Sequence, residues 1–427
     1  MVFPIWSLIP FFFMLSAIAV MPVIAPTWWG RNPNKVVFGA IVSTPVLYLV
    51  IPYAHLLLTH ALMNYVSFVV LMGALFVISG GIFIQGSFMG TPLMNTALLA
   101  SGAVLSNLIG TTGASMVLIR PYLRANRRRQ RKSHLIVFFI FLVSNIGGLL
   151  TPLGDPPLFL GFLLGVPFQW TLRLFPVWAF AVGALLIVFN LFDQIVFNRE
   201  EVESHGEVIE DLQPRRGLHI QGALNFAYLQ GVVGAAMSSS YFGWPKGVQE
   251  LMMIALALLS WFTTPRRLHE ANLFDFEPIA EVAALFLGIF VTMIPAVEIL
   301  NQRAPVWGFH KPWEYFWLSG VFSSFLDSAP AYLTFAAMAS GVVGGSAENL
   351  TTLVHSVAGE QLLRAVSCGS VFMGAVTYIG NGPNFMVKSI AQRASVNMPS
   401  FGGYLLYSGL ILLPLFVLIT LVFFPTP

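Results

Sequence analysis

Charge is what this sequence has least of. Only 9% of its 427 residues are charged, whereas soluble domains carry about 25%. Hydrophobic residues make up 57% of the chain, and the mean hydropathy is +0.79. This composition excludes a sizeable soluble domain. It predicts an all-α polytopic membrane protein whose main partner is membrane lipid.

Cysteine and catalytic motifs are equally scarce. The single cysteine, Cys368, excludes a disulfide framework, and we interpret it as a small buried apolar residue. The chain has no Walker loop, no nucleophile elbow and no metal-ligand cluster at the usual spacings. We therefore expect neither a primary pump nor an enzyme. Because basic residues lie in loops between apolar segments, we expect no nucleic-acid partner. No Lys or Arg precedes Arg31, so we expect the first apolar stretch to be a retained span.

One motif occurs twice inside apolar sequence. Residues 151–157 read TPLGDPP and residues 377–383 read TYIGNGP, so both fit T-x-x-G-[D/N]-x-P. Gly and Pro break a helix and free backbone groups that lipid cannot satisfy, so such breaks survive only within protein or beside a wet cavity. Two breaks in corresponding places of two halves are typical of the binding site of a secondary transporter.

Ten apolar segments approach the length of about 20 residues that a span needs. They are 7–27, 36–58, 61–84, 134–164, 174–197, 221–241, 248–264, 278–300, 352–393 and 402–424. Two of them, 134–164 and 352–393, contain the motif and are predicted to be broken helices. Two further stretches, 92–119 and 313–342, are interrupted by polar and small residues, which predicts re-entrant hairpins.

Basic residues predict the orientation in the membrane. The loop 120–132 carries six Arg and one Lys, which places it in the cytoplasm. Counting spans from this loop puts both termini outside a cell (inner) membrane and makes the second hairpin open on the face opposite to the first. We therefore predict an inverted-topology repeat of two halves, 1–197 and 221–427. The polar segment 198–220 is predicted to be a cytoplasmic linker.

Asp155 and Asp327 are the sharpest candidates for ion binding. A carboxylate at bilayer depth is costly and functional by default. Burial disfavours its charged form, so a proton and a metal cation can compete for it. The structural alternative is that each Asp caps the half-helix that follows. We favour binding, since the alignment of the halves places Gly110 opposite Asp327 and shows that the turn does not require an acid.

Short polar side chains gather at the hairpin tips and the broken helices. They are Ser106, Asn107, Thr111, Thr112, Ser144, Asn145, Thr151, Ser324, Ser328, Thr377, Asn381 and Asn384. Half-helix N-termini favour anions and freed carbonyls favour cations, so this site suits either sign. For any single residue, a bond back to its own helix is an equal alternative. Glu281 is an outside candidate for a proton pathway, and Lys388 is expected to snorkel toward the cytoplasm.

At these residues the chain resembles the ion-transporter superfamily, and within it the NhaD-type sodium/proton antiporters and the related citrate-transporter-like group. The resemblance lies in 106–121, 144–161, 277–295, 323–335 and 378–391. It implies a homodimer in which hairpins and broken helices move as an elevator against a static scaffold. In the antiporters, a Gly-Asp of the first broken helix and an Asp-Asn of the second hairpin are thought to handle cations. Gly154-Asp155 matches the first, while Ser328 replaces the Asn of the second.

Three functions stay open at this point. The first is a sodium/proton antiporter in which Asp155, Asp327 and Asn381 hold sodium, the transported or coupling ion, with no other cofactor. The second is a proton- or sodium-coupled symporter of citrate or a dicarboxylate. The dicarboxylate carriers of the superfamily hold substrate with Ser-Asn-Thr tips, where this chain has Leu108 in place of Thr and Ser323-Ser324 in the second tip. The third is a channel or an inactive scaffold, and two broken helices with opposed hairpins favour alternating access over it.

Overall fold

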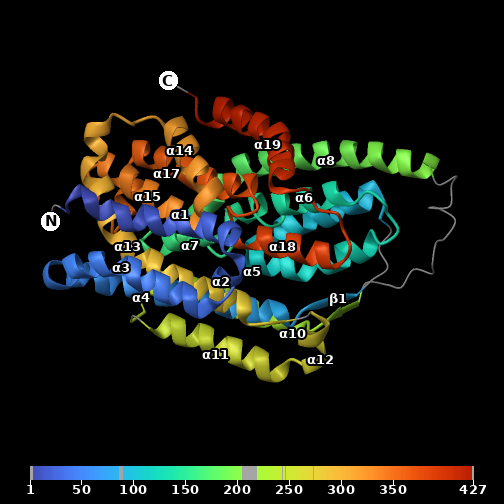
Figure 1. The fold of residues 1–427 in the computed structure, drawn as a ribbon, viewed down its shortest axis with the longest axis horizontal. Helices are drawn as coiled ribbons and strands as arrows, with labels where there is room; N and C mark the ends of the chain where they lie inside the picture. Colours follow the sequence, from blue (N-terminus) through green and yellow to red (C-terminus); the bar gives the residue numbers. More distant parts are fainter. Residues whose placement is uncertain are drawn as a thin grey trace.

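The computed structural model describes residues 3–85, 90–203, 219–242, 244–245, 247–272 and 274–425. The described chain is almost entirely helical, and Figure 1 shows the long helices α3, α4 and α8 lying roughly along the longest axis of the molecule. The elements of the first half are η1 (Ile5–Leu8), α1 (Ile9–Ile24), α2 (Pro26–Trp29), α3 (Asn32–Tyr53), α4 (His55–Gly80), β1 (Phe83–Gln85), α5 (Pro92–Ala125), α6 (Ser133–Leu142), η2 (Ile146–Leu150), α7 (Pro156–Leu163), η3 (Phe168–Leu174) and α8 (Phe175–Glu203). Those of the second half are β2 (His219–Gln221), α10 (Leu224–Phe242), α11 (Val248–Thr263), α12 (Arg266–Ala271), α13 (Glu277–Trp307), α14 (Pro312–Leu326), α15 (Ser328–Val342), α16 (Thr351–His355), α17 (Val357–Met373), η4 (Gly374–Val376), α18 (Gly382–Arg393) and α19 (Phe401–Phe423).

Seven helical segments in the described ranges are long and apolar enough to cross a membrane. They are Asn32–Tyr53, His55–Gly80, Pro92–Ala125, Ser133–Leu150, Phe168–Val202, Ile279–Arg303 and Phe401–Phe423, with shorter apolar helices at Ile5–Ile18 and Val248–Thr263. Each of the ten predicted spans falls on a helix, which confirms the polytopic helical fold. One boundary was wrong: α3 ends at Tyr53 and α4 begins at His55, because the apolar run 56–58 continues past the helix end and hydropathy does not register the break.

The long helix α5 folds back on itself. A straight helix of this length would extend about 50 Å at 1.5 Å per residue. Instead, the side chains of Asn95 and Asn126, near its two ends, exchange hydrogen bonds of 2.9 and 2.8 Å. The chain reverses at Gly110, where φ is 78° and ψ is 155°. The predicted hairpin is therefore present, but its second arm runs to Ala125 rather than 119, because the helix continues into the basic residues.

The second hairpin consists of α14 and α15, which pack against each other. The chain reverses at Asp327, where φ is 65° and ψ is 140°. This is nearly the conformation of Gly110, so the two residues that the sequence alignment paired occupy the same place at the two tips. A residue with a Cβ rarely adopts a positive φ, and doing so costs on the order of 1–3 kcal/mol.

Two local features go beyond the predicted pattern. A short ribbon, in which β1 pairs antiparallel with β2, joins the end of α4 to the start of the second half of this helical fold. The helix α8 continues to Glu203, past the predicted span end at 197. The rest of the predicted linker, 204–218, lies outside the described residues.

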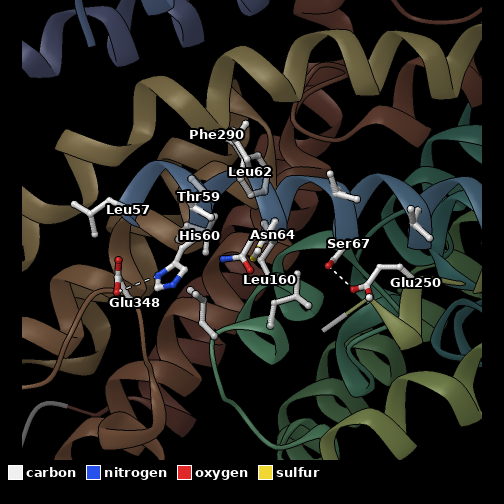
Figure 2. A pocket seen from close by; sticks show the side chains of 18 of the residues that line it. Leu57, Thr59, His60, Leu62, Asn64, Ser67, Leu160, Glu250, Phe290 and Glu348 are labelled. Atoms are coloured by element: carbon white, nitrogen blue, oxygen red, sulfur yellow. Dashed lines mark hydrogen bonds and ion pairs between the residues drawn. The ribbon is translucent and has the colours of Figure 1, made fainter. Parts of the chain in front are cut away.

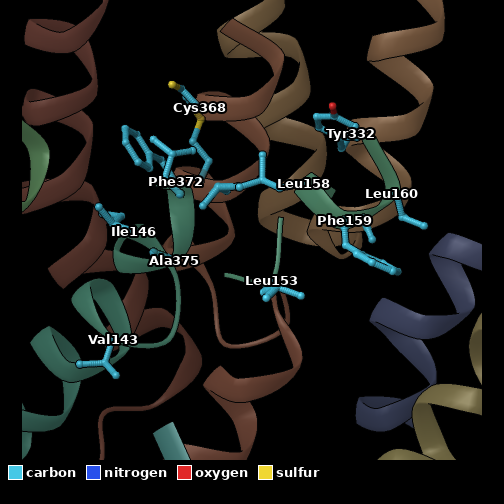
Figure 3. Packing of buried hydrophobic residues seen from close by; sticks show 14 of the residues in the cluster. Val143, Ile146, Leu153, Leu158, Phe159, Leu160, Tyr332, Cys368, Phe372 and Ala375 are labelled. Atoms are coloured by element: carbon cyan, nitrogen blue, oxygen red, sulfur yellow. The ribbon is translucent and has the colours of Figure 1, made fainter. Parts of the chain in front are cut away.

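The hairpins and broken helices form the best buried part of the described chain. The half-helix α7 packs against α15 and α17, and Figure 3 shows its Leu158 lying between Phe372 of α17 and Tyr332 of α15. Cys368 is fully buried beside Phe372, in agreement with its interpretation as a small apolar residue. Large apolar side chains on α3, α8, α11 and α19 are exposed, as expected for surfaces that face lipid.

Candidate functional site

The two motifs hold the hairpin tips to the broken helices in the same way. The Thr151 hydroxyl donates a 2.5 Å hydrogen bond to the carbonyl of Asn107 in the first hairpin. The Thr377 hydroxyl donates to the carbonyl of Ser324, the corresponding residue of the second hairpin. The threonine of each motif therefore fastens a hairpin to its own broken helix.

The glycine of each motif permits a close crossing of the backbone. A Cβ on Gly154 would lie 2.1 Å from the carbonyl oxygen of Gly148, and a Cβ on Gly380 would lie 2.6 Å from that of Gly374. Both distances are shorter than any ordinary contact, so a side chain at either place would force the crossing apart. The break thus needs two glycines in each half, of which the motif contains one.

Carbonyls freed by the breaks are satisfied within the protein. Thr171 donates 2.8 Å to the carbonyl of Leu150, and Ser408 donates 2.8 Å to that of Val376, its repeat equivalent. Two further donors act on carbonyls slightly earlier in each break: the Trp178 indole lies 2.9 Å from the Gly147 carbonyl, and the Tyr404 hydroxyl lies 2.8 Å from the Ala375 carbonyl. These donors meet the requirement that irregular backbone at membrane depth be satisfied internally. Sequence reasoning missed all four.

The two broken helices meet at a polar centre made by the equivalent residues Asp155 and Asn381. The Asn381 amide donates 3.1 Å to Asp155 Oδ1, which also accepts 3.0 Å from the Thr111 hydroxyl at the first hairpin tip. Asp155 is 1% exposed and Asn381 3% exposed. The closest contact between the two halves' motifs is therefore a carboxylate facing an amide, inside the protein.

Amides extend this centre away from Asp155. Asn145 donates 2.7 Å to Asn384 Oδ1, and Asn384 donates 2.8 and 2.9 Å to the carbonyls of Gly374 and Thr377. Asn381 Nδ2 also lies 3.3 Å from Asn145 Oδ1, and the hydroxyls of Ser144 and Ser115 are 2.8 Å apart. Of the predicted site residues, those brought into this one network are Thr111, Ser144, Asn145, Asp155, Thr377, Asn381 and Asn384.

One oxygen of the Asp155 carboxylate has no hydrogen-bond partner among the described residues. It occupies the N-cap position of α7, yet its side chain makes no capping hydrogen bond. Its Oδ2 is buried and accepts no hydrogen bond from any residue that the structure describes. The capping alternative therefore does not account for Asp155, whereas a proton or a cation at Oδ2 would supply the missing partner.

Asp327 is different, because it does act as a cap. Its Oδ1 accepts a 3.2 Å hydrogen bond from the backbone N–H of Ala329, in the first turn of α15. Its negative charge acts on the Asp155 carboxylate, since like charges repel. Asp327 thus has a structural role that Gly110 lacks, and it adds negative charge near the centre.

The other predicted residues lie at the hairpin tips. Ser106 and Ser324 are buried and donate to helical carbonyls of their own hairpin and to carbonyls of the adjoining broken helix. Ser328 is buried in the first turn of α15, and Thr112 is half-buried beyond the first tip. For Ser106 and Ser324, the back-bonding alternative is what the structure shows.

The residue next to the centre at the start of α18 is exposed. Gly382, which follows Asn381, is exposed, and nothing lies within 4 Å of the place where its Cβ would be. At the start of α7 the matching residue, Pro156, is only half-buried and carries no N–H. An exposed peptide group at this depth must line a wet cavity rather than lipid. Access to the polar centre is therefore expected beside Gly382.

A cavity lies away from the polar centre, between α4, α7, α11 and α13. Its volume is about 980 Å³, and no predicted site residue lines it. Figure 2 shows α4 running along this cavity, with Glu348 facing His60 at 3.5 Å and Glu250 facing Ser67 at 2.5 Å. The lining is mostly apolar and its charged side chains are acidic, so it does not suit an anion.

Two sets of ion pairs outside the centre were not predicted from the sequence. Lys35 and Glu281 form a 2.6 Å ion pair between α3 and α13, which gives Glu281 a structural partner. Arg129 is buried against Asp193, at 2.8 Å, and against Glu200. Since Asp193 also accepts a 3.0 Å bond from Asn95, this second cluster ties the base of the first hairpin to α8. The basic loop that indicated orientation thus contains a buried structural arginine.

Residues 2–424 match the sequence profile of a family described as "putative citrate transport". The chain belongs to this citrate-transport family. A search of the curated proteins found no match. Nearly the whole chain lies within the family match, which includes both hairpins and both broken helices.

Membership in the citrate-transport family fixes the broad class. The chain is a multi-pass membrane transport protein of the ion-transporter and citrate-transporter-like group, as the resemblance predicted. The family description agrees better with the organic-anion alternative than with the sodium/proton antiporter that we placed first.

Proposed function

We propose that this protein is a secondary carrier of citrate or a related dicarboxylate, coupled to a proton or a sodium ion. The observation that carries the proposal is the polar centre at which Asp155 meets Asn381. There, one half contributes a carboxylate with an open oxygen, and the other half contributes an amide next to the exposed residue Gly382. These two kinds of group suit a cation and an anion, respectively.

Helix N-termini converge at this centre and favour a carboxylate substrate. Asp155 and Asn381 are the N-cap residues of α7 and α18, and Thr111 begins the second arm of α5. Since hydrogen bonds join these three residues, three helices start within one small volume. Each start carries partial positive charge, equivalent to roughly half an elementary charge for a full helix. The convergence therefore compensates the negative charge of an incoming anion.

The coupling ion would bind on the Asp155 side. Pro156 and Pro157 follow Asp155 and supply no N–H donors, so the start of α7 offers a carboxylate without the amides that an anion needs. The start of α18 keeps the N–H of Gly382. Cation and anion would thus bind next to each other at opposite half-helices, which lets one stabilise the other.

A sodium/proton antiporter remains the second candidate, and the open Oδ2 of Asp155 is the observation in its favour. In that case Asp155 and Asp327 would bind sodium and protons alternately, with no organic substrate. We also propose that the protein is a homodimer working as an elevator, with hairpins and broken helices as the moving part. The packing of α14, α15 and α17 against one another, and of α15 and α17 against α7, supports movement of these elements as a unit.

Reconstitution into liposomes with a trapped pH dye tests both candidates. A proton gradient is imposed, and sodium, lithium, potassium, citrate and succinate are added in turn. We expect proton or sodium flux that depends on citrate or succinate, together with saturable uptake of the labelled anion. Flux triggered by sodium or lithium alone would establish the antiporter, and current without coupling would indicate a channel.

A further inference from the structure

The half-helices α7 and α18 carry side chains of different chemistry at one pair of equivalent positions. Phe162 lies seven residues after Asp155, and Lys388 lies seven residues after Asn381. Phe162 is buried in the apolar core, whereas Lys388 is half-buried on a helix with an exposed side. The second half therefore carries a cation where the first half carries a ring.

Lys388 lies on the face of α18 that leads to the polar centre. Positions three, four and seven residues apart share one face of a helix, so Asn381, Asn384 and Lys388 form a single row. The Lys388 Cα is about 10 Å from that of Asn381 along the axis, at 1.5 Å per residue. A di- or tricarboxylate and a lysine side chain together can bridge this distance.

The Lys388 ammonium is held by aromatic rings rather than by an acid. It lies 4.4 Å from the ring centroid of Tyr378 and 5.9 Å from that of Phe385. The Tyr378 ring is fixed in turn by Tyr404, at a centroid distance of 4.0 Å, and by a 3.1 Å bond from its hydroxyl to the Pro399 carbonyl. Cation–π contact positions the charge without neutralising it.

The fully buried cations of the described chain, Lys35 and Arg129, are paired in another way. Lys35 and Arg129 are each 2–4% exposed, and each is paired with a carboxylate of the protein. Among the described residues, no carboxylate forms an ion pair with Lys388, which lies on the helix that begins at the exposed Gly382. A partly desolvated, positioned ammonium at the entrance to the centre is suited to pair with an anion that arrives from solution.

We propose that Lys388 is a substrate-binding residue that receives one carboxylate of the anion, while a second carboxylate binds at the helix starts beside Asn381. This inference rests on the proposed function and specifies it: the substrate carries at least two carboxylates. A monocarboxylate would use the helix starts alone and would gain nothing from Lys388.

Uptake kinetics in proteoliposomes test this assignment. The variants are Lys388→Gln, Lys388→Met, which keeps the apolar stem, and Lys388→Arg, with Arg393→Gln as control because Arg393 is an exposed cation at the end of the same helix. We expect Gln and Met to raise the KM for citrate and succinate by about tenfold, the loss of roughly one charge-assisted hydrogen bond. The KM for acetate and the half-saturating concentration of the coupling cation should stay unchanged. The Arg variant and the control should lie close to wild type.

Each outcome decides between specific alternatives. Unchanged KM for citrate in a folded Gln or Met variant, checked by size-exclusion chromatography, would overturn the role of Lys388 while leaving the carrier intact. Equal increases for citrate and acetate would assign Lys388 a merely structural role and overturn it as well. Absence of any organic-anion uptake by the wild-type protein would instead overturn the proposed function itself.

Discussion

The two halves of this protein share a backbone and differ in their chemistry. Each has a hairpin that reverses at a positive φ, a threonine that holds the tip and a pair of glycines that cross. Yet Asp155 in one broken helix corresponds to Asn381 in the other, and Gly110 in one hairpin corresponds to Asp327 in the other. The repeat therefore retains what the backbone geometry requires and varies what a ligand would touch.

The placement of the acids follows from this difference. Each half contributes one carboxylate, the first at its broken helix and the second at its hairpin tip, so the two acids are not equivalent by symmetry. Asp155 leaves one oxygen without a hydrogen bond from the described residues, while Asp327 caps α15. A symmetric centre would hold two identical ions, whereas this asymmetric one suits two different species.

The largest effect is expected from making the broken helices identical with Asp155→Asn. Two amides would then face each other, and the open carboxylate oxygen would be lost. Coupled uptake should fall by about 100-fold, because a hydrogen bond or contact to a charged group contributes about 1.5–3 kcal/mol. Initial rates in proteoliposomes measure this, with Asp275→Asn, an exposed loop residue, as control. Full retained coupling would remove Asp155 from the site.

The crossings of the two broken helices should differ in their tolerance of a methyl group. Gly154→Ala and Gly380→Ala each place a Cβ against a carbonyl, at 2.1 and 2.6 Å, so both should destabilise by about 2–4 kcal/mol, with Gly154→Ala the worse. Gly409→Ala in α19 is the matched control, since nothing lies within 4 Å of its Cβ position. Thermal unfolding in detergent measures the order. Equal stability of Gly154→Ala and the control would mean that the crossing is looser than described.

Much of this architecture could be predicted because it depends on local chemistry. Gly and Pro inside apolar sequence mark the breaks of 134–164 and 352–393 with no knowledge of neighbours. The second copy of the motif then predicts that both breaks serve one purpose. Even the match of Gly110 with Asp327 followed from aligning the two halves.

The rest depends on contacts between distant segments, which no local pattern encodes. Trp178 and Tyr404 satisfy freed carbonyls that lie 31 and 29 residues earlier in the chain, and no local pattern marks them as donors. Nothing in the sequence around Asp155 indicates that its partner is Asn381, more than two hundred residues away. Asp327 caps its helix and Asp155 does not, because the packing around each residue decides whether its carboxylate can reach the backbone N–H groups of the helix that follows.

Asp327→Gly would give both hairpin tips the same residue. We expect it to change stability little and to reduce transport clearly. Asp327→Gly removes the 3.2 Å cap of α15 but relieves the positive φ of a residue with a Cβ. A lost cap costs about 1 kcal/mol and relief of such strain gains a similar amount, so the melting temperature should change little. Uptake should nevertheless fall by about tenfold, since a carboxylate near Asp155 is lost. An unstable but active variant would show that Asp327 serves the fold alone.

The smallest effects on stability are expected from removing the hydroxyl donors that satisfy the freed carbonyls. Thr171→Val and Ser408→Ala each remove a 2.8 Å hydrogen bond to an equivalent carbonyl, that of Leu150 or Val376. Each should destabilise by about 1 kcal/mol, the typical net contribution of one hydrogen bond. If the halves are energetically alike, the two losses should agree, and the double variant should show their sum because the sites lie in different halves. Chemical unfolding monitored by tryptophan fluorescence measures all three. If only one variant lost stability, the two halves would share their geometry but not the free energy that these hydrogen bonds contribute. The broken helix of the unaffected half would then be stabilised by the packing around it.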